Sequence, residues 1–148
     1  MAVLILAGIN AEAKKTMVPK MYMFGISASF TDSIVFFTNV QEVDSAWIES
    51  KNKFLLDRHI YSAQLRDYLA NTLQMPHRTS IVYYDTNRAK LEKKFIKVRR
   101  LYIEQQSKKK KKKQQTSHFE VRYLDNTDFR FKALDASFYN EEEGQGGK

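Results

Sequence analysis

The stretch "MYMFGISASF", residues 21–30, decides the fold of this chain, because its side chains alternate along the backbone. One face would carry Tyr22, Phe24, Ile26, Ala28 and Phe30, and the other Met23, Gly25, Ser27 and Ser29. A period of two predicts a half-buried β-strand. The turn residues "TDS" and the apolar stretch "SIVFFTNV", residues 33–40, follow it, so we expect a β-hairpin whose second strand lies inside a sheet.

Two stretches further along the chain have the periodicity of amphipathic helices. Residues 61–76, "YSAQLRDYLANTLQMP", and residues 86–106, "TNRAKLEKKFIKVRRLYIEQQ", carry apolar side chains at three- and four-residue spacing. The second of them has Lys and Arg on the face opposite its apolar side chains. Residues 78–85, "RTSIVYYD", lie between the two and predict a short strand rich in β-branched and aromatic residues.

Alternation near the end of the chain predicts one more strand at 118–124, "HFEVRYL", and possible pairing of 129–134, "FRFKAL". Residues 41–60 have no clear period and give no firm prediction. The order of elements predicts an α+β fold: a two-layer sandwich in which a small mixed sheet, opened by the hairpin, carries both amphipathic helices on one face. With 148 residues, the chain is long enough for one domain, which we expect over 20–134.

The N-terminus resembles a secretory signal. Eight apolar residues, Ala2–Ile9, precede Ala11 and Ala13, which have the small-x-small spacing that signal peptidase accepts. Eight residues are too few to span a bilayer, so we expect residues 1–13 to be a cleaved signal peptide and the protein to be periplasmic or secreted, with no transmembrane anchor after cleavage. The alternative is that these residues form a buried first strand, since no basic residue precedes the apolar run.

The charge of the chain is concentrated in one run. The formal net charge is +8, and the six consecutive lysines at 108–113 supply most of it. No aromatic residue lies between Gln105 and Ser117, so this run predicts a solvated, flexible loop at 107–116, with the second helix ending near Gln105. The possible polyanion contacts are Lys108, Lys109, Lys110, Lys111, Lys112, Lys113, Arg99 and Arg100. The end of the chain, 135–148, is acidic and Gly-rich and predicts a flexible tail.

No set of residues predicts catalysis or a cofactor. The chain has no cysteine, which excludes disulfides and thiolate chemistry. His59, His77 and His118 are scattered without metal-ligand spacing, and the glycines form neither a nucleophile elbow nor a phosphate-binding loop. We therefore expect a non-enzymatic protein without a metal or cofactor site.

Two blocks of sequence carry a resemblance. "MYMFGISASFTDSIVFFTNVQEVDSAW" and "HRTSIVYYDTNRAKLEKKFIKVRRLY" are similar to a group of short exported proteins of anaerobic Gram-negative bacteria for which no activity is known. This resemblance implies a location in the cell envelope and no catalysis. The shorter stretch "SIVYYDTNRAKLEKKF" resembles half of a SPOR-type peptidoglycan-binding domain.

Two functional hypotheses follow from these observations. The first is an exported, soluble, non-enzymatic domain that binds another cell-envelope component, either a protein or a glycan. The second is a cytosolic nucleic-acid-associated protein that uses the lysine run and the basic helix face. The export signal favours the first hypothesis, because an exported protein rarely meets DNA or RNA.

Overall fold

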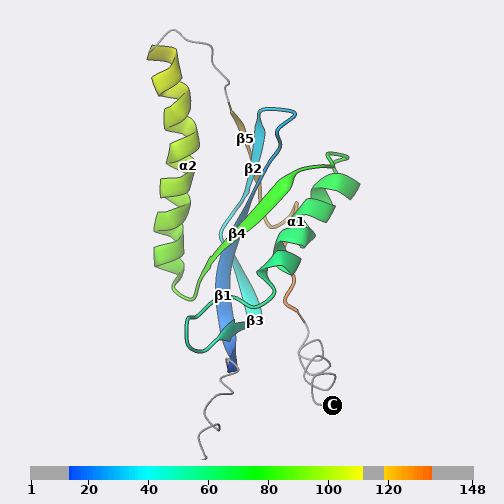
Figure 1. Cartoon of the computed structure of the whole chain (residues 1–148), viewed down its shortest axis with the longest axis vertical. Coiled ribbons are helices and arrows are strands. Elements are labelled where there is room, and N and C mark those ends of the chain that lie inside the picture. The colour runs from blue at the N-terminus through cyan, green and yellow to red at the C-terminus, as the bar shows by residue number, and fades with distance from the viewer. Residues whose placement is uncertain (1–13, 112–118, 135–148) are drawn as a thin grey trace, which may run out of the picture.

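Strand β1 (Lys15–Ala28) is the central strand of a five-stranded mixed sheet (Figure 1). The structure is a computed structural model that describes residues 14–111 and 119–134, with the backbone alone for 104–111. The other strands are β2 (Ile34–Thr38), β3 (Gln41–Glu49), β4 (Thr79–Asp85) and β5 (Glu120–Leu124). Tyr22 and Met23 have antiparallel partners in both β3 and β4, so these two strands lie on opposite edges of β1. β2 is antiparallel to β1, and β5 is parallel to β2.

The two helices, α1 (Arg58–Asn71) and α2 (Arg88–Lys111), cover opposite faces of this sheet (Figure 1). Met21 and Met23 of β1 belong to the buried cluster that contains Leu65 of α1. Phe24 belongs to a second cluster, which contains Leu91 of α2. The α+β class, the mixed sheet and the opening hairpin are confirmed, but the expected two layers with both helices on one face are wrong. Because β1 is apolar on both faces, each face needs its own cover.

The opening hairpin contains a β-bulge at its end. Ile26 faces Phe37 and Met23 faces Gln41, so two residues of β1 lie opposite three residues of the returning chain. The amide of Gly25 turns toward this bulge and donates to the hydroxyl of Thr38 at 2.9 Å. A Cβ atom on Gly25 would lie only 2.7 Å from Cδ2 of Leu65, so the glycine lets α1 pack closely on the sheet.

The fold includes two stretches that the sequence pattern did not identify as strands. β1 begins at Lys15, before the expected domain start at residue 20, and continues through Pro19. β3 occupies part of the stretch for which there was no prediction. Its buried residues lose their alternation at Ser45, which has a φ of 64°, and the register shows no pair between Ser45 and Pro19. This local break hides the period of two in both strands.

Helix α2 is longer than expected. Its N-terminus is capped by Asn87, whose side-chain Oδ1 accepts from the amide of Lys90 at 3.1 Å. The helix continues to Lys111 instead of ending near Gln105, so part of the expected loop at 107–116 is helical. Lysine is a good helix former, and each like-charge pair costs only about 0.2–0.5 kcal/mol, which explains why the run does not end the helix. Residues 1–13, 112–118 and 135–148 lie outside the described residues, and with them the expected signal peptide and tail.

The last described segment, residues 129–134, has no regular secondary structure and does not join the sheet. Phe129 and Phe131 are buried in the cluster on the α1 side. The side-chain amide of Gln41 donates to the carbonyl of Phe129 at 2.9 Å and accepts from the amide of Phe131 at 2.9 Å. Gln64 on α1 makes the same two bonds with the backbone of Lys132. Hydrogen bonds with two glutamine side chains therefore hold residues 129–132. The sequence pattern had predicted that this segment pairs as a strand.

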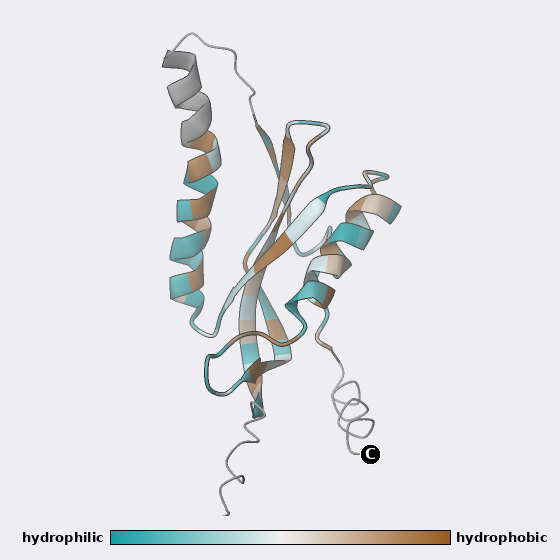
Figure 2. Cartoon of the chain, in the orientation of Figure 1, coloured by the Kyte–Doolittle hydropathy of each residue, from teal (hydrophilic) through white to brown (hydrophobic). Residues whose placement is uncertain are grey.

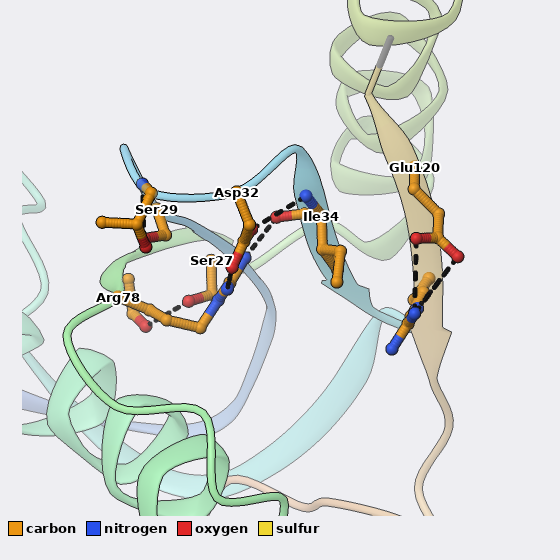
Figure 3. A network of polar contacts seen from close by, with 9 residues as sticks. Ser27, Ser29, Asp32, Ile34, Arg78 and Glu120 are labelled. Atoms are coloured by element: carbon orange, nitrogen blue, oxygen red, sulfur yellow. Dashed lines mark hydrogen bonds and ion pairs between the residues drawn. The ribbon is translucent and has the colours of Figure 1, made fainter.

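A buried arginine ties the hairpin turn to the start of β4 (Figure 3). The Arg78 side chain is 1% exposed, and its Nη1 lies 2.8 Å from Oδ2 of Asp32. Its Nη2 donates to the carbonyl of Ile34, and the guanidinium lies over the ring of Phe36, 5.1 Å from the centroid. This pairing holds the pKa of Asp32 below its usual value, mainly through the hydrogen bond from Arg78.

Candidate polyanion interface

Aromatic packing fixes the orientation of α2 on the sheet. Leu91 and Val98 are buried against the sheet, and Phe95 packs edge-on against Phe24, with 5.1 Å between ring centroids. Tyr102 packs edge-on against Phe37 at 5.6 Å. These contacts leave one side of the helix to face the sheet, and Figure 2 shows hydrophilic residues along the side turned away from it.

The exposed surface of α2 carries five cationic side chains that we call the basic stripe. The basic stripe consists of Lys90, Lys93, Lys94, Lys97 and Arg100. Their spacing of three and four residues places them on one side of the helix. At 1.5 Å per residue, the stripe extends over about 15 Å of the helix axis. It therefore presents a row of positive charges on a rigid support.

Acidic residues are few along this helix. The sequence of α2 contains two, Glu92 and Glu104, and Glu92 pairs with Arg88 at 3.0 Å. Two like-charge pairs, Lys90 with Lys94 and Lys93 with Lys97, are four residues apart and lower the stability of the helix slightly. A bound polyanion would relieve this repulsion, so the stripe has the electrostatic character of a binding surface.

Aromatic residues on the same face of the sheet belong to the core. Tyr83 stacks on Phe24 at 5.0 Å with an interplanar angle of 14°, and Lys94 lies over the outer part of this pair, 5.7 Å from the Tyr83 centroid. Arg88 lies 5.9 Å from the ring centroid of Tyr22. The rings pack against one another and against cations, so they are not free platforms for stacked bases.

The structure separates the residues that the sequence pattern grouped as polyanion contacts. Arg100 belongs to the basic stripe, whereas Arg99 is half-buried and its Nε is buried without a hydrogen-bond partner among the described residues. The backbone of α2 extends through Lys108–Lys111, and Lys112 and Lys113 lie outside the described residues. The sequence analysis predicted a basic helix face but did not name the four lysines of the stripe as contacts. Their spacing of three and four residues could have identified them.

Other parts of the described chain offer less defined chemistry. A hollow of about 560 Å³ lies between α1 and the turn that follows β5. Its charged side chains are Asp67, Asp128, Arg130 and Lys132, so it has no preference for either sign of charge. Within 14–111 and 119–134, no three His, Asp or Glu side chains gather at metal-binding distances. In the same ranges, no helix is both long and apolar enough to cross a membrane.

Comparisons of the chain with protein-family models, with curated proteins and with solved structures find no match.

Proposed function

We propose that this protein is an exported, non-enzymatic binding module that holds an anionic component of the cell envelope through the basic stripe of α2. The observation that supports this proposal is the row of five exposed cations from Lys90 to Arg100 on a helix, α2, whose sequence contains only two acidic residues, Glu92 and Glu104. Acidic glycans and anionic lipid headgroups are the chemical classes that such a row attracts.

The rigidity of the helix supports this function. A flexible run of lysines loses conformational entropy when it binds, whereas the stripe is already held by the packing of Phe95 and Tyr102 on the sheet. Each Lys or Arg close to an anionic membrane surface contributes about 1 kcal/mol. Several such contacts together give a salt-sensitive attachment without a specific pocket.

The location in the envelope rests on the sequence of residues 1–13. We expect the protein isolated from cells to begin at Lys14 and to be found outside the cytosol, because signal peptidase would cut after Ala13. Mass spectrometry of the N-terminus after cell fractionation measures this. A protein with Met1 intact in the cytosolic fraction would contradict export and favour the nucleic-acid alternative.

The stripe itself is tested by changing three of its charges. A variant with Lys93→Gln, Lys97→Gln and Arg100→Gln should bind heparin and phosphatidylglycerol vesicles roughly a hundredfold more weakly at low salt, because three surface contacts of about 1 kcal/mol each are removed. A control with Lys51→Gln, Arg130→Gln and Lys132→Gln loses the same charge at exposed positions outside α2 and should bind like the wild type.

The two variants lose the same number of charges, so a difference in their binding would depend on where those charges lie. Equal loss in both variants would show that only net charge matters and would contradict the proposed interface. Tighter binding to duplex DNA than to heparin and vesicles would favour the cytosolic alternative. Thermal melts of both variants verify that the fold is intact, since all six changed side chains are exposed.

A further inference from the structure

The outer edge of β4 has no partner strand among the described residues. β4 pairs only with β1, through seven consecutive residue pairs from Tyr22 with Asp85 to Ala28 with Thr79. The loops, turns and caps of 14–111 and 119–134 donate no backbone hydrogen bond to this edge. In Figure 1 the strand crosses the molecule between α1 and α2, so its open edge lies between two helices.

The register identifies which backbone groups point outward. Gly25 directs its amide to Thr38, away from β4, and its partner in β4 is Val82. In an antiparallel pair, the amide and carbonyl of one residue point to the same side, so those of Val82 point to the open edge. The alternation of the strand adds Ser80 and Tyr84, giving three residues with donors and acceptors available for another strand.

Each of the other outer strands has charges within its length that discourage pairing, whereas the one charged residue of β4 is Asp85 at its end. β3 carries Glu42 and Asp44, followed by the positive φ of Ser45, and β5 carries Glu120 and Arg122. The sequence of β4 from Thr79 to Tyr84 has no charge and no proline, and its ladder with β1 has no bulge. Such an uncharged, regular edge is a template for strand addition.

Hollows of different chemistry flank the two sides of this edge. On the α2 side, a hollow of about 240 Å³ is lined mainly by apolar residues: Ile26, Ala28, Phe30, Ile81 and Tyr102. Within it, Phe30 is fully exposed and Ile81 is 46% exposed. On the α1 side, a hollow of about 420 Å³ is lined by Arg58, His59, Ser62 and Arg66 together with β4 itself. Arg66 pairs with Asp67 at 3.4 Å, but no carboxylate lines the hollow.

We propose that the open edge of β4 binds an extended peptide segment of a partner protein by strand addition. Successive side chains of an added strand point to opposite faces, so the segment would alternate apolar residues toward the α2 side with acidic residues toward the α1 side. The backbone hydrogen bonds supply affinity, and the two hollows supply selectivity. This site lies next to one residue of the basic stripe, since the ammonium of Lys94 is 5.7 Å from the ring centroid of Tyr83 in β4.

A second copy of the chain fits this edge less well. Antiparallel pairing of two β4 strands about a two-fold axis places both α1 helices on the same face of the joined sheet. Arg58 and Arg66 of one copy would then face the same residues of the other. Like charges in such an interface are unfavourable, whereas an acidic side chain at that place is attracted.

The probe is an end-blocked fluorescent heptapeptide that alternates valine and glutamate, compared with one that has lysine in place of glutamate. The wild type should bind the glutamate peptide at least about tenfold more tightly. Val82→Pro removes one outward N–H and leaves the ladder with β1 intact, and Ile81→Lys places a charge at the apolar hollow. Each should weaken binding about tenfold. The double variant Arg58→Glu, Arg66→Glu should instead prefer the lysine peptide.

Circular dichroism monitors the fold of each variant, and if Val82→Pro does not fold, Ile81→Lys at an exposed position carries the test. The proposal is overturned if the wild type does not bind the glutamate peptide, or if folded edge variants bind it as well as the wild type. A wild-type dimer in sedimentation that Ile81→Lys converts to a monomer would assign the edge to a second copy and also overturn the proposal.

Discussion

Replacing Gln41 by glutamate is expected to lower the free energy of unfolding at neutral pH by about 3 kcal/mol, because a buried donor becomes a buried charge. The Gln41 side chain is 4% exposed, and its amide nitrogen donates to the carbonyl of Phe129. In Gln41→Glu, a carboxylate oxygen would face that carbonyl oxygen. The segment that buries Phe129 and Phe131 would lose one of its two hydrogen bonds to residue 41 and gain a repulsion.

The loss in Gln41→Glu should depend on pH with a defined sign. Burial and the facing carbonyl favour the protonated carboxyl, which can donate again, so the folded state raises the pKa of this group above its unfolded value. The restored hydrogen bond is then fully present below the unfolded pKa and is lost as the pH rises through the folded pKa. Urea unfolding of the variant should therefore show a smaller deficit in acid than at neutral pH.

Gln64→Glu is the matched control, because Gln64 makes the same pair of hydrogen bonds with the backbone of Lys132. That site is exposed, so water can solvate the new carboxylate, and we expect a loss of less than about 1 kcal/mol. Equal losses in the two variants would contradict the argument that burial at Gln41 decides the effect. We call the two hydrogen bonds between the Gln41 side chain and the backbone of Phe129 and Phe131 the clamp. A Gln41→Glu variant as stable as the wild type would contradict a stabilising role of the clamp.

The contacts of Gln41 also show where sequence reasoning stopped. The opening hairpin, both helices and β4 were predictable, since each depends on a local period of two or of three to four residues. The clamp joins residues 88 positions apart, and no local pattern signals it. The alternation of Phe129 and Phe131 indicated correctly which side chains are buried, but the segment is not a strand and is held by side-chain amides instead of a strand partner.

The candidate interface was predictable in part for the same reason. The helical period identified a basic face, and Arg100 was named as one of its residues. The lysine run attracted attention because of its charge, yet its first four residues extend α2. The helices lie on opposite faces, and one edge of β4 is open, because of the order in which the strands pair. This order depends on contacts between residues distant in the sequence. The apolar character of both faces of β1 was the signal for this arrangement.

Asp32→Asn is expected to cost about 3 kcal/mol of stability, because it leaves the guanidinium of Arg78 buried without a counter-charge. The Arg78 side chain is 1% exposed, whereas that of Asp32 is 33% exposed. Arg78→Met should cost less, since it removes the buried charge, keeps a long side chain over Phe36 and leaves a carboxylate that water can reach. Adding Asp32→Asn to Arg78→Met should then change stability very little.

Acid should produce the same loss in the wild type. The folded state lowers the pKa of Asp32, so its contribution is present above the unfolded pKa and is lost as the pH falls through the folded pKa. Urea unfolding across the acid range should show this loss in the wild type and much less of it in Arg78→Met. Identical acid sensitivity in both proteins would contradict a role for the pair. Since Arg78 directly precedes β4, a weaker pair should also loosen the strand whose open edge we propose as a binding site.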